Sequence, residues 1–229
     1  MNTEPASNDP ALLRLLQLVS PALPVGAYAY SQGLESAIDQ GWVTDEESAW
    51  HWIGGLLKHS LCRLDVPLFT RLYAAWEMAD EARVNTWNAC LYAGREAAEL
   101  QREDHHLGTA LARLLTDLGM PEATAWRTAP RVCFATLFSL AAVRWHIGVG
   151  PATQGYLWAW VENQVMAATR LIPLGQTAGQ RLLVRLMPAI LRAARDGSTL
   201  EDEDLGCAAP GLALASTFHE TQYSRLFRS

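Results

Sequence analysis

Hydrophobic residues recur at helical spacing along nearly the whole of this chain. Near the N-terminus, four of them fall at i, i+3, i+4 and i+7: Leu12, Leu15, Leu16 and Val19. This spacing places them on one face of a helix, which Asp9-Pro10 is suited to begin and Ser20-Pro21 to end. No stretch alternates apolar and polar residues between hairpin dipeptides, as the strands of a sheet do. The pattern therefore predicts an all-α protein.

Capping residues indicate where two further helices begin. Thr44 and Glu47 form a T-x-x-E capping box, and Asp65 with Pro67 begins the helix after it. Apolar residues at helical spacing follow both starts: Trp52, Ile53, Leu56, Leu57, Leu68, Leu72, Tyr73 and Trp76. We expect these side chains to form the core of the two helices.

The second half of the chain carries comparable boundaries. Gly119 follows a leucine-rich helix and is the residue type that commonly ends one. Thr128 and Pro130 precede a strongly apolar helix and are expected to begin it. Thr177 is placed to cap a later helix, in which Pro188 is expected to cause a kink or a break.

The length of 229 residues fits one domain with a substantial core. We expect a single globular domain of about eight to ten helices over residues 9–215, after a flexible N-terminus at 1–8 and before a flexible docking tail at 216–229. Charged residues make up 18% of the chain and hydrophobic residues 50%, whereas typical globular domains have about 25% charged residues. So few charges predict a sizeable protein–protein interface.

Charge and composition exclude several classes of protein. A net charge of −6 argues against nucleic-acid binding, which depends on clustered Lys and Arg. The longest apolar stretch, 132–143, is far shorter than the ~20 residues of a membrane helix, and the polar N-terminus lacks the features of a secretory signal. The four cysteines lie far apart with no C-x-x-C pair: Cys62, Cys90, Cys133 and Cys207. We expect reduced thiols and a cytoplasmic protein.

Motifs of catalysis are missing from the sequence. It contains no Walker A motif, no G-x-G-x-x-G after a strand, no G-x-S-x-G and no H-E-x-x-H. The chain is therefore not expected to bind a nucleotide or act as an enzyme. Glu162 with His146 is the one acid–base pairing that a small helical enzyme could use.

Histidines raise the separate question of a metal site. His105 and His106 are adjacent on a predicted helix and point about 100° apart, which makes joint chelation awkward. His59 and Cys62 at i, i+3 form a possible half-site for a soft divalent metal, although chance placement on a helix explains them as well. The sequence predicts no metal site of its own.

Four stretches, in chain order, match the pattern of one protein family. They read L-V-S-P-A-L-P-V-G-A-Y-A-Y-S-Q-G-L-E-S at 18–36, Y-A-G-R-E-A-A-E-L-Q-R-E-D at 92–104, A-W-V-E-N-Q-V-M-A-A-T-R-L-I-P-L-G-Q-T-A-G-Q-R-L-L at 159–183, and H-E-T-Q-Y-S-R-L-F-R-S at 219–229. Together they resemble the UreF family of urease accessory proteins. The match departs from the family pattern at His105-His106 and at Thr217-Phe218.

The resemblance implies a non-enzymatic, dimeric, all-α protein. Such a protein binds a UreD-type partner, called UreH in some species, recruits the GTPase UreG and docks on apo-urease to deliver nickel. In that role no cofactor is bound stably: nickel is a client in transit, and GTP is bound by the partner. The alternative is a nickel-binding metallochaperone with ligands drawn from five residues: His59, Cys62, His105, His106 and His219.

The tail combines arginines with large apolar side chains, the mixture that dominates binding energy at interfaces. We expect docking on the UreD-type partner through seven of its residues: His219, Glu220, Tyr223, Arg225, Leu226, Phe227 and Arg228. The alternative is a frayed chain terminus.

Partner contacts are also expected in the other matching stretches. In 18–36, Pro24, Gly26 and Gly33 are expected to shape the backbone. Four residues with polar side-chain ends are candidates for partner binding: Tyr28, Tyr30, Ser31 and Glu35. A purely structural role of the segment at the N-terminus explains them equally well. In the 92–104 stretch, charged residues at helical spacing are interpreted as a solvated, salt-bridged face: Arg95, Glu96, Glu99, Glu103 and Asp104. The alternative is that this face binds the GTPase.

In the third stretch, polar residues lie mid-helix among apolar neighbours. Glu162, Asn163 and Gln164 need hydrogen-bond partners there. Capping of the loop of Leu174, Gly175 and Gln176 would satisfy them, as would a dimer contact or a hydrated channel wall. Because Trp158 and Trp160 flank one residue, we expect one of them to be buried and the other to reach a partner.

Overall fold

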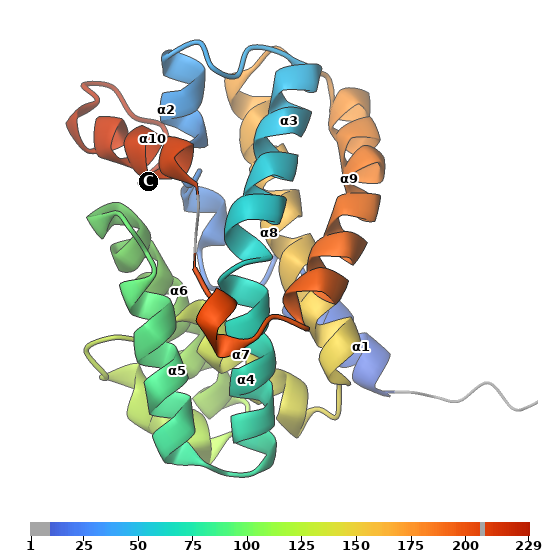
Figure 1. Ribbon diagram of the computed structural model, residues 1–229, viewed down its shortest axis with the longest axis vertical. Helices are drawn as coiled ribbons and strands as arrows, with labels where there is room; N and C mark the ends of the chain where they lie inside the picture. Colours follow the sequence, from blue (N-terminus) through green and yellow to red (C-terminus); the bar gives the residue numbers. More distant parts are fainter. Residues whose placement is uncertain (1–9, 207–208) are drawn as a thin grey trace, which may run out of the picture.

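The computed structural model describes residues 10–206 and 209–229, and the regular structure in this part of the chain is entirely helical (Figure 1). Ten α-helices lie within it: α1 (Pro10–Leu18), α2 (Leu34–Asp39), α3 (Glu46–Leu56), α4 (Asp65–Glu77), α5 (Glu81–Ala93), α6 (Ala98–Asp117), α7 (Phe134–Arg144), α8 (Val149–Leu171), α9 (Gln176–Gly197) and α10 (Pro210–Thr221). A π-helical turn at Leu57–Leu61 and 3-10 turns at Ala27–Ala29, Pro121–Arg127 and Asp202–Asp204 complete them. The predicted all-α single domain is confirmed.

Helix α8 lies at the centre of the packing. It contacts α9, α2, α7 and α4, while α3 packs on α9 (Figure 1). Between α4, α7 and α8 an aromatic cluster fills the core: the rings of Phe69 and Tyr156 have centroids 5.4 Å apart, and Phe138 lies 5.6 Å from Tyr156. The stripe predicted for α4 is confirmed, since Leu68, Leu72, Tyr73 and Trp76 are all buried.

Several predicted helix boundaries are displaced by one or more residues. The capping box of α3 uses Asp45 and Ser48, not Thr44 and Glu47: the Asp45 carboxylate accepts from Ser48 N at 2.8 Å, and Ser48 Oγ accepts from Asp45 N at 3.0 Å. Asp45 takes the extended conformation that an N-cap requires. Gly119 does follow the end of α6, with a positive φ of 89°.

The later helix starts also differ from expectation. Helix α7 begins at Phe134, after Thr128 and Pro130, because the Asp104 carboxylate of α6 accepts a hydrogen bond from Phe134 N at 2.6 Å. Helix α9 begins at Gln176, next to Gly175 and before Thr177, and it continues through Pro188 without a break.

Helix α1 exposes much of the face that periodicity assigned to the core. Leu12 and Leu16 are 58% and 55% exposed, whereas Leu18 is buried. Helix α1 packs on α8, where Gly155 lets it approach closely: a Cβ there would lie 2.6 Å from Leu15 Cδ1. The spacing identified an apolar face correctly, but the described residues cover only part of it, because Leu15 and Val19 are partly buried while Leu12 and Leu16 are exposed. The expectation for residues 1–8 lies outside the described part.

Candidate functional site: a buried polar junction

The four stretches that carry the family resemblance meet in space. At their centre, the Gln32 side chain donates from Nε2 to Glu103 Oε1 of α6 at 2.6 Å and accepts from Trp160 Nε1 of α8. From α8, Asn163 and Gln164 donate to the main-chain oxygens of residues 30 and 31 at 2.9 and 3.0 Å. The C-terminal residues contact the same segment, as described below. We call this meeting point of residues 18–36, α6, α8 and the chain's C-terminal residues the polar junction.

The backbone of the 18–36 segment is bent by residues with positive φ. Gly26 and Gly33 have φ values of 80° and 76°, and Gln32 one of 52°. A Cβ on Gly33 would lie 3.1 Å from Ala215 Cβ of α10, so α10 approaches closely because this residue has no side chain. Pro24 is exposed, as is Tyr28, whereas Tyr30, Ser31 and Glu35 are buried.

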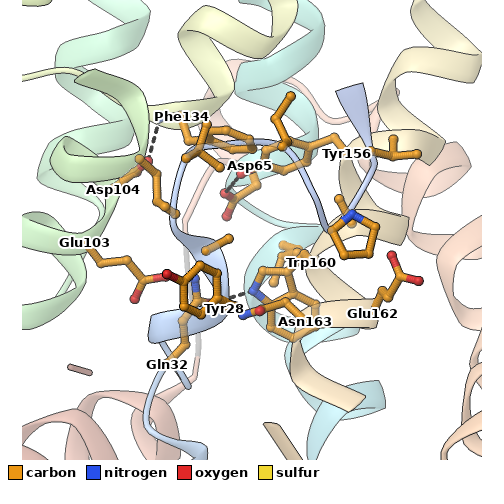
Figure 2. A pocket seen from close by; sticks show the side chains of 18 of the residues that line it. Tyr28, Gln32, Asp65, Glu103, Asp104, Phe134, Tyr156, Trp160, Glu162 and Asn163 are labelled. Atoms are coloured by element: carbon orange, nitrogen blue, oxygen red, sulfur yellow. Dashed lines mark hydrogen bonds between the residues drawn. The ribbon is translucent and has the colours of Figure 1, made fainter. Parts of the chain in front are cut away.

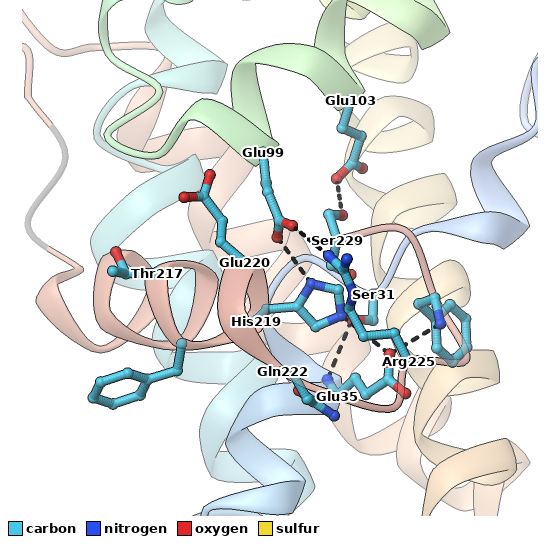
Figure 3. Close-up of polar contacts among 12 residues, drawn as sticks. Ser31, Glu35, Glu99, Glu103, Thr217, His219, Glu220, Gln222, Arg225 and Ser229 are labelled. Carbon is cyan, nitrogen blue, oxygen red and sulfur yellow. Dashed lines mark hydrogen bonds and ion pairs between the residues drawn. The ribbon is translucent and has the colours of Figure 1, made fainter.

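A buried histidine joins α10 to the rest of the junction (Figure 3). His219 is 0% exposed, with Nε2 3.1 Å from Glu35 Oε2 of α2 and Nδ1 2.9 Å from Glu99 Oε2 of α6. A carboxylate oxygen and a ring nitrogen form a hydrogen bond only with a proton between them. The two contacts therefore need two protons, which the three side chains share. Arg225 adds a longer contact, from Nη1 to Glu99 Oε1 at 3.3 Å. The cluster ties three helices to the chain's last residues.

Residues 222–229, which we call the C-terminal segment, follow α10 and lie against the junction. Leu226 N and Phe227 N donate to the two oxygens of Glu35 at 2.7 and 2.9 Å. Further on, Ser31 N donates to Ser229 O at 2.8 Å, and Ser229 Oγ donates to Glu103 Oε2 at 2.6 Å.

The expectation of a flexible tail at 216–229 is corrected in two respects. Residues 216–221 belong to α10, and the C-terminal segment is hydrogen-bonded to the body of the molecule because Glu35 and Ser31 supply partners for its backbone. Phe227 is buried within this chain and is not free to fill a partner's pocket, and His219 is buried too. Five of the predicted docking residues remain exposed around them: Glu220, Tyr223, Arg225, Leu226 and Arg228.

The interpretation of the 92–104 stretch as a solvated face is wrong. Glu99, Glu103 and Asp104 are all buried, and of the five residues assigned to that face only Glu96 is exposed. Helical spacing places these residues near one another, as predicted, but their face is turned inward because the 18–36 segment and α10 cover it.

Arg95 forms ion pairs with two buried carboxylates next to this acidic face, those of Asp65 and Asp104. Its guanidinium contacts Asp65 at 2.6 and 3.0 Å and Asp104 at 2.9 Å, and Tyr156 donates to Asp65 at 2.8 Å. Burial alone would lower the pKa of Arg95, but the two carboxylates raise it well above its usual value, so the arginine stays charged. Sequence reasoning assigned Asp65 only to a helix start, since nothing in the spacing links it to Arg95.

A cavity of about 120 Å³ lies beneath the 18–36 segment, between α4, α6 and α8 (Figure 2). Its wall is apolar at Phe134 and polar at Asp65, Glu103 and Glu162. Burial raises the pKa of Glu103 to about 7, although hydrogen bonds from Ser229 and Gln32 lower it. Burial also raises the pKa of Glu162. The cavity is large enough and polar enough to hold water.

The polar residues of α8 form hydrogen bonds with a different segment of the chain from the one expected. Asn163 and Gln164 hold the 18–36 segment and do not cap the loop at 174–176, where Gly175 and Gln176 are exposed. The two tryptophans are not divided into one buried and one exposed, since Trp158 and Trp160 are both partly buried.

No group of three or more His, Cys, Asp or Glu among the described residues is arranged to hold a metal ion. His59 is exposed while Cys62 is buried, and burial raises the pKa of the Cys62 thiol. His106 Nδ1 lies 3.0 Å from the Tyr30 hydroxyl, and burial lowers the pKa of His105. Cys207 lies outside the described residues.

The acid–base pairing considered for a small helical enzyme is not formed around the cavity. Glu162 lines the cavity, but His146 is exposed beyond the end of α7 and is not among the lining residues. No helix in the described part of the chain is long and apolar enough to cross a membrane.

Comparisons with known proteins agree with the resemblance. The family model described as UreF matches residues 43–187. The urease accessory protein UreF of Alkalilimnicola ehrlichii is 53% identical over 216 residues, which cover 94% of this chain and 95% of that protein. Proteins of the same name from Hahella chejuensis and Chromohalobacter salexigens are 48% and 49% identical, and cover 96% and 100% of this chain and 98% and 100% of their own lengths.

Proposed function

This chain belongs to the UreF family of urease accessory proteins, and from that premise we propose that it is a scaffold for nickel insertion into urease. It is an accessory protein and not an enzyme. In this proposal the chain binds a UreD-type (UreH-type) partner in the cytoplasm and recruits a UreG-type GTPase. The assembly then acts on apo-urease, with nickel as the client in transit and GTP bound by the partner.

One observation carries the proposal: the buried cluster around His219 holds the C-terminal segment in place while two of its large side chains, those of Tyr223 and Leu226, face outward. Tyr223 is fully exposed and Leu226 is 67% exposed, although the Leu226 backbone is held by Glu35. A backbone that is already ordered loses little entropy when its side chains are bound. This arrangement favours docking of a protein partner on the segment.

Two further exposed apolar surfaces support additional interfaces, and we propose that one of them serves a homodimer. The first lies on α1 and consists of Leu12, Leu13 and Leu16. The second lies on α9 and consists of Val184, Met187 and Leu191. Exposed apolar groups of this kind are typical of surfaces that bind other proteins.

Binding of the UreD-type partner to variants of the segment tests the proposal. We expect the double substitution Tyr223→Ala with Leu226→Ala to weaken that complex by at least roughly tenfold, because exposed aromatic and aliphatic anchors dominate interface energy. A matched control is Met78→Ala with Leu118→Ala, which removes exposed apolar side chains elsewhere. Isothermal titration calorimetry measures both. Equal affinity of the two double variants would refute the assignment of this docking surface.

A further inference from the structure

A second pocket lies where the 18–36 segment, α6 and the C-terminal segment meet. We call it the arginine pocket, and its described wall consists of Val25, Gly26, Tyr28, Ala29, Tyr30, His106 and Arg228. Its volume of about 200 Å³ is far above the roughly 10–15 Å³ that one water molecule needs. No described Asp or Glu belongs to this wall, so the side chains in it that can carry a charge near neutral pH are both basic.

Arg228 belongs to the wall with a guanidinium that has no partner. Its backbone N donates to Ala29 O at 2.8 Å, and Phe227 and Ser229 on either side of it are buried, so its backbone is fixed. The Arg228 side chain is exposed, and no described residue forms a hydrogen bond or an ion pair with its guanidinium. Five N–H donors in a planar fork are therefore available to a ligand.

Tyr30 engages one ring nitrogen of His106 and leaves the other free. The Tyr30 hydroxyl lies 3.0 Å from His106 Nδ1, and Tyr30 is 5% exposed. When the hydroxyl donates to Nδ1, the neutral ring carries its hydrogen on Nε2. No described residue accepts from Nε2. The ring therefore adds a second free N–H group to the wall that contains the Arg228 guanidinium.

The acidic side chains of the polar junction are engaged by other groups and do not neutralise these donors. Glu35 and Glu99 both contact His219. Glu103 accepts from Ser229 Oγ at 2.6 Å. The arginine pocket is thus complementary to an anion that the described part of the chain does not supply.

We propose that the arginine pocket binds a carboxylate, and that an Asp or Glu side chain of a docking protein supplies it. The docking protein is the one that binds the C-terminal segment, so this identification of the partner rests on the proposed function. Leu226 is 67% exposed and lies two residues before Arg228, so a protein bound to Leu226 also reaches the pocket. Arginine binds a carboxylate through two parallel hydrogen bonds, which gives such a contact a defined direction as well as strength.

The charge of the whole chain favours a single carboxylate over a ligand with several negative charges. A net charge of −6 repels polyanions as they approach. A protein that docks through apolar contacts, by contrast, brings one carboxylate to the pocket and keeps its other charges away from it. The fixed backbone of Arg228 also means that only its side chain has to be ordered on binding.

Binding of the UreD-type partner to Arg228→Gln tests this inference. The substitution removes the guanidinium and keeps the backbone hydrogen bond to Ala29, so the C-terminal segment stays in place. We expect isothermal titration calorimetry at low ionic strength to show an affinity at least roughly tenfold lower. The affinity should also depend less on salt concentration, because one ion pair has been lost. Arg228→Lys keeps the charge without the fork and should recover part of the affinity.

Arg127→Gln is the matched control, because Arg127 is an exposed arginine outside the wall of the pocket, and it should bind like the unchanged chain. Equal affinity and equal salt dependence of Arg228→Gln and Arg127→Gln would overturn the inference. Tighter partner binding on addition of inorganic phosphate at constant ionic strength would assign the pocket to a free anion and would overturn it as well. The proposed docking surface is decided separately, by Tyr223→Ala with Leu226→Ala, so each can fail without the other.

Discussion

At the residue scale, the account depends on His219 and its two glutamates. Three side chains from α2, α6 and α10 meet around one buried ring, and the same glutamates accept from the C-terminal segment. Buried charges of this kind are stable only when each has its partner. His219 is therefore a structural residue of the junction, although its place in the sequence had indicated a docking tail.

Replacement of His219 tests this role. We expect His219→Ala to destabilise the fold by about 3–5 kcal/mol, because Glu35 and Glu99 each lose the buried ring that neutralises them, although their contacts with the C-terminal segment remain. His51→Ala is the matched control: His51 contacts Glu47 at 3.4 Å but is largely exposed, and its loss should change stability by less than about 0.5 kcal/mol. Urea unfolding at pH 7 measures both. A cost for His219→Ala as small as that of the control would contradict the account.

At the element scale, the sequence pattern predicts well which segments are helical, but poorly which helix faces are covered by other parts of the molecule. The stripe of α4 is buried as expected because other helices surround it, whereas the α1 stripe is covered only in part, with Leu12 and Leu16 exposed. Periodicity reports that a face is apolar but carries no information on what packs against it. The capping box of α3 is displaced by one residue, since Asp45 and Thr44 are both suitable N-caps and the geometry selects between them.

Two glycines of the 18–36 segment provide a comparison at this scale. Both have positive φ, but a Cβ on Gly26 meets nothing within 4 Å, whereas one on Gly33 meets Ala215 of α10. We expect Gly26→Ala to cost roughly 1 kcal/mol for its backbone conformation alone. Gly33→Ala should cost about 1–3 kcal/mol more, because α10 must shift. Thermal unfolding compares the two variants, and similar losses would mean that α10 does not pack on Gly33 as described.

At the scale of the whole molecule, contacts between distant residues bring the junction together. Gln32 reaches Glu103, 71 positions away, and Ser31 reaches Ser229, 198 positions away. Family resemblance identified the stretches that contain these residues, but no spacing rule predicts that they meet. The solvated interpretation of Glu99 and Glu103 failed for the same reason, since burial depends on segments that lie far away in sequence.

The junction also explains why deletion of the last five residues is a poor test of docking. It would remove Phe227 from the core and the partners of Ser31 and Glu103, so a lost complex could reflect a damaged fold. Substitution of exposed side chains avoids this difficulty. Tyr223 and Leu226 make no side-chain hydrogen bond within the described structure, so their removal should leave the junction intact.

Activation of apo-urease is the most direct test of the central claim that this chain is a non-enzymatic scaffold with its docking face on the C-terminal segment. The chain is mixed with UreD-type and UreG-type proteins, apo-urease, nickel and GTP, and urease activity is measured. We expect activation with the unchanged chain and with Met78→Ala/Leu118→Ala, and a loss of at least roughly tenfold with Tyr223→Ala/Leu226→Ala. Full activation without the chain, or equal activation by both double variants, would contradict the account.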